Sequence, residues 1–333
     1  METNLSSAQL GRVKDVWGEG NLWRDPNVVH WTQLRRVQER LNLLTSGDYN
    51  KNRFEYFMEK YLRLPVKRAL TLGCGQGDLE RGLCGYNFAL AHDGFDIAEG
   101  AILKASNLAK ESHLSNLRYR VADMNTIQLP RYEYDVVFGI GSFHHVAALE
   151  HLMIQVSQTL KPGGYLFLDE YIGPNQFQWP DEQLSIINEQ IEAMPDRFKM
   201  SLSEPRVPKG PMRRHTIEEM IAADPSEAIR SADILPLLYN VFDVIEVKGC
   251  GGALLHLLLE HIAGNFAGED PESVDYLFSL FDAEDRLTAE GKLQHDFAII
   301  IARKKTTAGT WARYCANRVL SFGNSRSDPE LPT

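Results

Sequence analysis

The sequence lacks three features: closely spaced cysteine pairs, long apolar runs and an excess of basic over acidic residues. Its four cysteines, Cys74, Cys84, Cys250 and Cys315, form no C-x-x-C pair, which predicts free thiols in a reducing compartment. No apolar stretch is long enough for a transmembrane helix, and the N-terminus resembles no signal peptide, so a soluble, cytoplasmic protein without a membrane partner is expected. The net charge of −10 disfavours nucleic acid as a partner, because phosphate binding relies on clustered Lys and Arg.

What the sequence does contain is a short apolar run, residues 69–72, that ends in three alternating glycines. Gly73, Gly75 and Gly77 are followed by a segment that favours a helix, residues 78–86. Glycines at this place bring backbone N–H groups close to a ligand, because no Cβ stands in the way. The spacing is G-x-G-x-G and differs from the G-x-G-x-x-G of dinucleotide folds. By itself this loop is a weak indication, since glycines also form ordinary tight turns.

Further strands and helices alternate at regular intervals after the loop. Strands are predicted over 89–96, 117–123, 134–141 and 160–169, with helices over 98–111 and 147–159. This alternation predicts parallel βαβ units and a doubly wound α/β sheet. Asp96 ends the second strand, where an acid is placed to accept hydrogen bonds from a ribose diol.

Residues 66–171 resemble a class I S-adenosylmethionine-dependent methyltransferase of the small-molecule type. The glycine loop, the acid Asp96, the pair Asp123 and Met124, and the turn at 160–164 match that family's motifs in order. The resemblance implies a mostly parallel, Rossmann-like seven-stranded sheet that closes with an antiparallel hairpin, residues 242–248 and 295–304. It also implies S-adenosyl-L-methionine as cofactor, with contacts at Leu72, Gly73, Cys74, Gly75, Gly77, Asp96, Ile97, Asp123, Met124, Gly139, Ile140 and Gly141. One departure from the family is Thr71, which stands where many members carry an acid. The carboxylate contact that those members make with the cofactor therefore has no counterpart at this position.

Five regions are expected along the 333 residues, and no internal repeat is present. They are an N-terminal arm with helices that cover the active site (1–65), the cofactor-binding core (66–171), a mainly helical substrate lid (172–240), the end of the sheet (241–305) and a mobile tail (306–333). Residues 1–25 are expected to be loose or to be ordered by a ligand, and residues 252–264 are expected to form the helix before the last strand.

Candidate catalytic residues follow the fourth and fifth strands, where open α/β sheets bind their ligands. A sulfonium methyl group is a strong electrophile, so the protein mainly aligns the acceptor and removes its proton. His144 and His145 follow the fourth strand, and Glu170 and Tyr171 follow the fifth. In the alternative interpretation, the second histidine packs against the next helix and the glutamate is a buried carboxylate satisfied by Arg or backbone amides. Glu170 and Tyr171 face opposite ways in a strand, so at most one of them points at the substrate.

The lid carries the densest basic cluster of the chain, residues 209–215. Arg213 and Arg214 in this cluster are candidates for binding an anionic substrate. The alternative is ion pairing with the nearby acids Glu218, Glu219, Asp224 and Glu227. Trp179 either lines a substrate pocket or anchors the lid to the body. No metal is expected, because the family can work without one and no acid cluster demands one.

The function predicted from these residues is methyl transfer to an oxygen, less favourably a nitrogen or carbon, of a small molecule. An anionic molecule or a sugar derivative is a candidate acceptor. Two alternatives stay open: a cofactor-binding protein that does not methylate, such as a regulatory subunit, and an enzyme that uses the sulfonium for another reaction. The aromatic N-terminal helices suit either a homodimer interface or a cover over the active site.

Overall fold

A computed structural model describes residues 6–19, 29–202, 206–268 and 270–305, and its centre is one seven-stranded sheet. The strand order is β3-β2-β1-β4-β5-β7-β6. The strands are β1 (Val66–Leu72), β2 (Ala89–Asp96), β3 (Leu117–Val121), β4 (Tyr134–Ile140), β5 (Leu160–Tyr171), β6 (Phe242–Gly249) and β7 (Phe297–Lys304).

The first five strands are parallel, and β7 lies antiparallel between β5 and β6. The predicted doubly wound sheet and its closing hairpin are therefore confirmed. The order reverses between β1 and β4, and this reversal is where open α/β sheets bind ligands, beyond the carboxyl ends of the strands.

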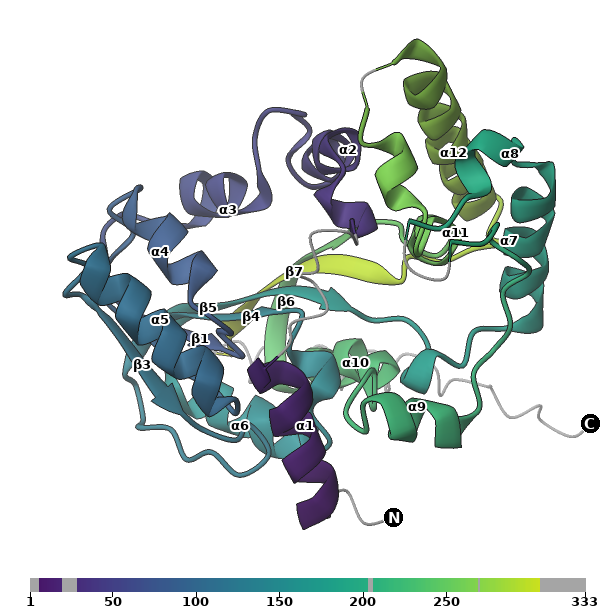
Figure 1. Cartoon of the computed structure of the whole chain (residues 1–333). Helices are drawn as coiled ribbons and strands as arrows, with labels where there is room; N and C mark the ends of the chain where they lie inside the picture. The colour runs from purple at the N-terminus through teal and green to yellow at the C-terminus, as the bar shows by residue number, and fades with distance from the viewer. Residues whose placement is uncertain (1–5, 20–28, 203–205, 269, 306–333) are drawn as a thin grey trace, which may run out of the picture.

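Helices cover both faces of the sheet (Figure 1). On one face, α3 (Arg53–Tyr61) and α4 (Asp78–Cys84) bury Phe57 and Leu83 against Val136 and Phe138. On the other face, α6 (Leu149–Thr159) and α10 (Ile234–Val241) pack on β4, β5 and β7. The helix α5 (Glu99–Glu111) packs along β2 and β3. Because both faces are covered, the central strands read as nearly continuous apolar runs.

A second apolar core joins helices from both ends of the chain. Figure 1 shows these helices gathered beyond the sheet, on the side away from α4 and α5. They are η2 (Trp31–Gln33), α2 (Arg35–Ser46), α7 (Asp181–Ala193), α8 (Asp196–Lys199), α11 (Leu255–Leu259), η6 (Ala263–Phe266) and α12 (Pro271–Ala289). The insertion after β5 also contains η4 (Asn175–Phe177), α9 (Ile217–Ala223) and η5 (Ser231–Asp233).

Two expectations about local structure are wrong. Residues 7–19, predicted to belong to an arm that is loose unless a ligand orders it, form helix α1 (Ser7–Glu19) without a ligand. The helix before the last strand is α12, and the stretch 252–264 contains only the short α11 and η6. The α12 helix begins at Asp270, whose side chain accepts a hydrogen bond from the backbone N–H of Ser273, with Pro271 in the first turn.

The predicted mobile tail, residues 306–333, lies outside the described residues. In the part of the chain that the structure describes, no helix combines the length and apolar character that a membrane span requires.

Candidate functional site

The glycine loop follows β1 and has an open surface at its middle. A Cβ added to Gly73 would lie 2.3 Å from Cβ of Ser142, and the φ of Gly73 is +73°, so only glycine fits there. A Cβ added to Gly75 or to Gly141 would meet no atom within 4 Å. The loop is therefore tight where it meets the protein and open where a ligand would approach its backbone amides.

Asp96 connects this loop to the end of β2. Its Oδ2 accepts a hydrogen bond from the N–H of Gly75 (2.8 Å) and its Oδ1 accepts one from the N–H of Ala98 (2.9 Å). Burial raises the pKa of Asp96 above its ordinary value, although these amide hydrogen bonds oppose the rise. The carboxylate thus stands beside the loop, at the place expected of a ribose acceptor.

The other predicted cofactor contacts lie around the same carboxyl ends of the strands. Asp123 and Met124 follow β3, and Oδ1 of Asp123 accepts a hydrogen bond from the N–H of Asn125 (2.8 Å). The Met124 methyl carbon lies 3.6 Å from the position of a Cβ on Gly73. The remaining predicted cofactor contacts lie in β1, in β4 or in the loops that follow β1 and β2: Leu72, Cys74, Gly77, Ile97, Gly139 and Ile140. Because the Leu72 side chain is fully buried in the core, this residue offers a ligand only its backbone.

Ser142 joins the glycine loop to the segment that carries the two histidines. Its Oγ donates a hydrogen bond to the carbonyl of Leu72 (2.7 Å), and its Cβ fills the place that glycine leaves free at position 73. The short 3-10 helix η3 (Phe143–His145) follows Ser142 immediately. The predicted cofactor end and the predicted catalytic end are therefore in direct contact.

The predicted catalytic residues His144 and Glu170 form a hydrogen bond. Glu170 is 1% exposed, and its Oε1 accepts hydrogen bonds from the backbone N–H groups of Ser142 (2.8 Å) and Phe143 (2.7 Å). Its Oε2 lies 2.7 Å from Nδ1 of His144 and accepts the proton of that nitrogen. The alternative of a buried carboxylate satisfied by backbone amides thus holds for one oxygen, while the other orients His144.

Opposite effects act on the pKa of His144. Burial lowers it, but the hydrogen bond and charge of Glu170, together with Glu227 and Asp224, outweigh burial and raise it. Since Nδ1 is used by Glu170, Nε2 is the atom of His144 that remains for a proton or a ligand.

His145 is held by a second set of partners from the lid. Its Nδ1 lies 3.1 Å from Oγ of Ser226, and that hydroxyl donates its own proton to Asp224 (2.7 Å). The Ser226 oxygen therefore accepts the Nδ1 proton of His145. Burial and the neighbouring His144 lower the pKa of His145 to about 4.

Trp17 of α1 covers this group. Its indole N–H donates to Oδ2 of Asp224 (2.9 Å), and its ring lies edge-on to His145 with centroids 4.9 Å apart. The same helix packs against α5, which follows Asp96. Helix α1 therefore contacts elements at both ends of the candidate site.

Tyr171 and Trp179 belong to an aromatic cluster, and the Tyr171 ring also lies edge-on to His144 of the polar group, with centroids 6.2 Å apart. The Tyr171 hydroxyl donates to the carbonyl of Pro174 (3.2 Å), and its ring lies edge-on to Phe177. Trp179 is 3% exposed and stacks on Phe177, with centroids 4.8 Å apart. These contacts support the interpretation that Trp179 anchors the lid.

The two lid arginines are in ion pairs. Arg213 forms a bidentate pair with Glu219 (2.7 and 2.8 Å). Arg214 pairs with Asp181 and donates from Nε to the carbonyl of Trp179 (2.8 Å). Asp224 and Glu227 do not serve as their partners and instead face the two histidines.

A buried acid lies beneath the glycine loop. Thr71 Oγ1 forms a hydrogen bond with Nε2 of His92 (3.0 Å), and the side chain of Glu80 in α4 is fully buried beside them. Burial raises the pKa of Glu80 to about 7, with the Thr71 hydroxyl and the Glu80 backbone opposing the rise. Neither carboxyl oxygen makes a well-formed hydrogen bond within the described residues.

Sequence reasoning missed Glu227, Asp224 and Ser226 as members of the site, and it missed Trp17 and Glu80. The sequence suggests Asp224 and Glu227 only as ion-pair partners of the basic cluster, and it suggests no role for Ser226. A signal existed in the run Asp224-Pro-Ser-Glu227, which has polar side chains and a helix-breaking proline inside the insertion. Nothing in one sequence says which strand end such a loop meets.

Comparisons with known proteins agree with this geometry. The model of the methyltransferase domain family matches residues 70–168. A 27-O-demethylrifamycin SV methyltransferase of Amycolatopsis mediterranei is 27% identical over 167 residues, which cover 48% of this chain and 54% of the relative. A ubiquinone biosynthesis O-methyltransferase of Coxiella burnetii is 28% identical over 166 residues, 50% of this chain and 62% of the relative. The matches thus span between half and two thirds of these relatives.

Among solved structures, a Haemonchus contortus phosphoethanolamine N-methyltransferase 2 in complex with S-adenosyl-L-methionine is 15% identical, with a TM-score of 0.46. The alignment covers 84% of this chain and 61% of that one. The family assignment depends instead on the domain match, the two relatives and the glycine loop with Asp96. By these, residues 70–168 form a methyltransferase domain that is similar to the class I S-adenosylmethionine-dependent enzymes.

Proposed function

We propose that this protein transfers a methyl group from S-adenosylmethionine to an oxygen of a small-molecule acceptor. The observation that carries the proposal is the contact made by Ser142, which attaches the His144 segment to the open glycine loop. The glycine-loop end of the site suits a nucleoside cofactor. The histidine end offers a ring nitrogen that can take the proton of the methyl acceptor. The two relatives named for O-methylation support oxygen as the methylated atom.

The residues present fit the cofactor. Gly75 and Gly141 leave room beside the backbone, and Asp96 stands next to the loop with a carboxylate for the ribose hydroxyls. Asp123 and Met124 would lie along the adenine. When bound, the cofactor supplies an electrophilic methyl group on a sulfonium, so the protein needs mainly to orient the acceptor and exclude water.

The acceptor hydroxyl must lose its proton, and His144 is the residue arranged to receive it. Glu170 holds Nδ1, which fixes the ring and leaves Nε2 at the carboxyl end of β4. This orientation by a buried carboxylate is the arrangement that makes a histidine an effective base, worth about 100- to 10,000-fold in rate. Tyr171, whose hydroxyl is used by Pro174, would contribute its aromatic ring to the acceptor side.

The acceptor class follows from the lid. Phe177 is the partly exposed member of the aromatic cluster that it forms with the buried Tyr171 and Trp179, and it suits an acceptor with an apolar or planar body. Binding of an anionic acceptor by Arg213 and Arg214 stays a prediction, and it requires the acceptor to replace Glu219 or Asp181. The sugar-derivative acceptor, the cytoplasmic location, the absence of nucleic-acid partners, the homodimer and the five-region division also stay predictions.

The test begins with calorimetric titration of S-adenosylmethionine and S-adenosylhomocysteine into the full chain. Binding is expected, with a marked loss in Asp96→Ala and none in Glu111→Gln, an exposed acid at the end of α5 that serves as matched control. Isotope-labelled cofactor is then incubated with cell extract, and labelled products are identified by mass. Cofactor binding without any labelled product across extracts would favour the non-methylating alternative, and absence of binding would refute the proposal.

A further inference from the structure

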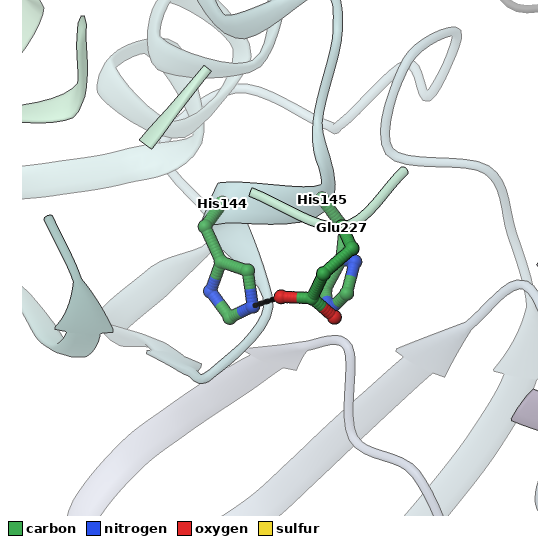
Figure 2. A group of neighbouring side chains, drawn as sticks. All are labelled: His144, His145 and Glu227. Carbon is green, nitrogen blue, oxygen red and sulfur yellow. Dashed lines mark ion pairs between the residues drawn. The ribbon is translucent and has the colours of Figure 1, made fainter. Parts of the chain in front are cut away.

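Three donor atoms converge at the end of β4, as Figure 2 shows for His144, His145 and Glu227. The two histidines come from η3, and Glu227 comes from the lid segment between α9 and η5. One ligand atom from each residue lies within 4.8 Å of the others. The Glu227 carboxylate lies 3.5 Å from Nε2 of His144 and 3.9 Å from Nε2 of His145.

Hydrogen bonding does not account for this convergence. A hydrogen bond between nitrogen and oxygen spans about 2.7–3.2 Å, so both distances to Glu227 are too long. At His145, the Nδ1 proton goes to Ser226, because the Ser226 hydroxyl donates to Asp224. The Nε2 of the neutral ring is then a lone pair that faces a carboxylate oxygen, another acceptor. Two facing acceptors are stabilised when a cation lies between them.

The outer contacts orient both rings in the way that metal-binding histidines are oriented. The Nδ1 of His144 donates to the buried carboxylate of Glu170, and the Nδ1 of His145 donates to Ser226. Such partners fix the tautomer and turn Nε2 towards the metal in known centres. Metal–nitrogen and metal–oxygen distances of about 2.0–2.2 Å hold neighbouring donors roughly 3–3.5 Å apart. The observed separations come close to this range, and small side-chain rotations would close the rest.

We propose that Nε2 of His144, Nε2 of His145 and the Glu227 carboxylate bind a divalent transition-metal ion. Two imidazoles and one carboxylate suit ions such as Zn²⁺, Mn²⁺, Fe²⁺, Co²⁺ or Ni²⁺, and they leave coordination positions open. Within the described residues this is the group of its kind that the structure brings together. This proposal departs from the expectation that no metal binds. The sequence could not suggest the site, because Glu227 is distant from the two histidines along the chain.

The role of the ion rests on the proposed function, whereas its binding does not. An acceptor hydroxyl that coordinates a divalent ion loses its proton to solvent near neutral pH, and the resulting oxygen is the nucleophile. Oxygen then forms the bond to the methyl carbon as the carbon–sulfur bond breaks, and the bonding pair stays on sulfur. In the metal-loaded protein the ion binds Nε2 of His144, so this nitrogen does not receive the proton of the acceptor hydroxyl.

The test is binding of Co²⁺ to the full chain after treatment with a chelator and its removal, at pH 7.5. One equivalent is expected, with visible absorption bands that report nitrogen and oxygen ligands. Glu227→Gln and His145→Gln are expected to weaken binding by more than about 100-fold, beyond the roughly 10- to 100-fold that loss of an outer partner costs. Glu218→Gln, an exposed glutamate in α9, is the matched control and should bind as wild type does.

Two outcomes would overturn the proposal: no Co²⁺ binding by the wild-type protein, or equal binding by wild type and Glu227→Gln. The wild-type spectrum needs no variant to fold, and circular dichroism checks the variants. Titration of S-adenosylmethionine in the same samples separates this test from that of the proposed function. Cofactor binding without metal binding refutes only the metal site, and metal binding without cofactor binding refutes only the proposed function.

Discussion

The two ends of the candidate site are built in different ways. The cofactor end comes from neighbouring residues: the glycine loop after β1, and Asp96 at the end of the adjacent β2. The histidine end combines η3, β5, the lid segment around Glu227 and α1, which are far apart in the sequence. A site that depends on local backbone geometry can be recognised from a short sequence motif. A site assembled from distant segments appears in the sequence only as scattered polar residues.

The largest effect is expected from Glu170→Gln, which acts on the histidine end alone. The amide oxygen of glutamine can still accept from the backbone of Ser142 and Phe143, but its NH₂ group would face Nδ1 of His144. The imidazole proton then moves to Nε2, which loses its lone pair. We expect kcat to fall by about 100- to 10,000-fold.

The measurement for Glu170→Gln is single-turnover methyl transfer alongside calorimetric titration of the cofactor. Affinity for S-adenosylmethionine should not change, because the glycine loop and Asp96 are untouched. A variant with wild-type turnover would show that His144 needs no orientation by Glu170. A variant that lost cofactor affinity instead would show that the two ends are not separable.

The converse change is Asp96→Asn, which acts on the cofactor end. It removes a charged acceptor, and hydrogen bonds to charged groups are worth about 1.5–3 kcal/mol each. We expect the Kd of S-adenosylmethionine to rise about 10- to 100-fold, measured by calorimetry. Co²⁺ binding at the histidine end should stay as in wild type. An unchanged Kd would mean that the ribose is not bound at Asp96.

Glu80→Gln addresses the buried acid beneath the glycine loop. Its pKa of about 7 lies above the ordinary 4.5, so the folded protein retains a proton that the unfolded chain releases. Folding stability is therefore lost as pH rises from 4.5 to 7, and the penalty is complete above pH 7. The shift corresponds to about 3 kcal/mol at most.

The free energy of unfolding by urea is the measurement for Glu80→Gln. The variant should exceed wild type in stability at pH 8 and approach it at pH 4. Its ionisable neighbours Asp78, Arg81 and Cys74 are unchanged by the substitution, so the difference between the two pH values isolates Glu80. Equal stability at pH 8 would show that the Glu80 carboxylate is accommodated in its charged form.

The smallest effect is expected from Trp17→Phe. Phenylalanine retains an aromatic edge towards His145 but cannot donate to Asp224. We expect kcat/KM to fall about 3- to 10-fold, the range of one hydrogen bond. Deletion of residues 1–19 should act more widely, because α1 also packs on α5. If the deletion and the point variant have the same effect, the contact with α5 does not contribute to cofactor binding.

The sequence predicted the sheet well because its signals are periodic and local. Apolar runs that end at glycine predicted β1 and β4, a short run that ends in the acid Asp96 predicted β2, and the glycine spacing predicted the loop after β1. The helix α12 was missed although Leu277, Leu280, Phe281, Glu284 and Leu287 lie buried at helical spacing, because its acidic residues obscure the pattern. Helix α1, with Val13 buried, was missed because it shows few apolar residues.

The histidine end was predicted only in part. His144, His145 and Glu170 could be named because strand ends in this sheet type carry the chemistry. Their hydrogen bonds, and the approach of Glu227, depend on how the lid folds back over β4, which no local pattern encodes. The ion pairs of Arg213 and Arg214 illustrate the same difficulty. Of the four acids named from the sequence only Glu219 is a partner, and the partner of Arg214 is Asp181, which was not among them.

The position of Glu227 has a consequence for how this protein could diverge from its relatives. The insertion after β5, which is predicted to be a substrate lid, also supplies the carboxylate that faces the histidines, together with Ser226 and Asp224 behind it. Under the proposed function, exchanging this insertion for that of a relative would change acceptor choice and proton handling in a single step. We therefore expect a functional chimera to need residues 224–227 even when the rest of the lid is replaced.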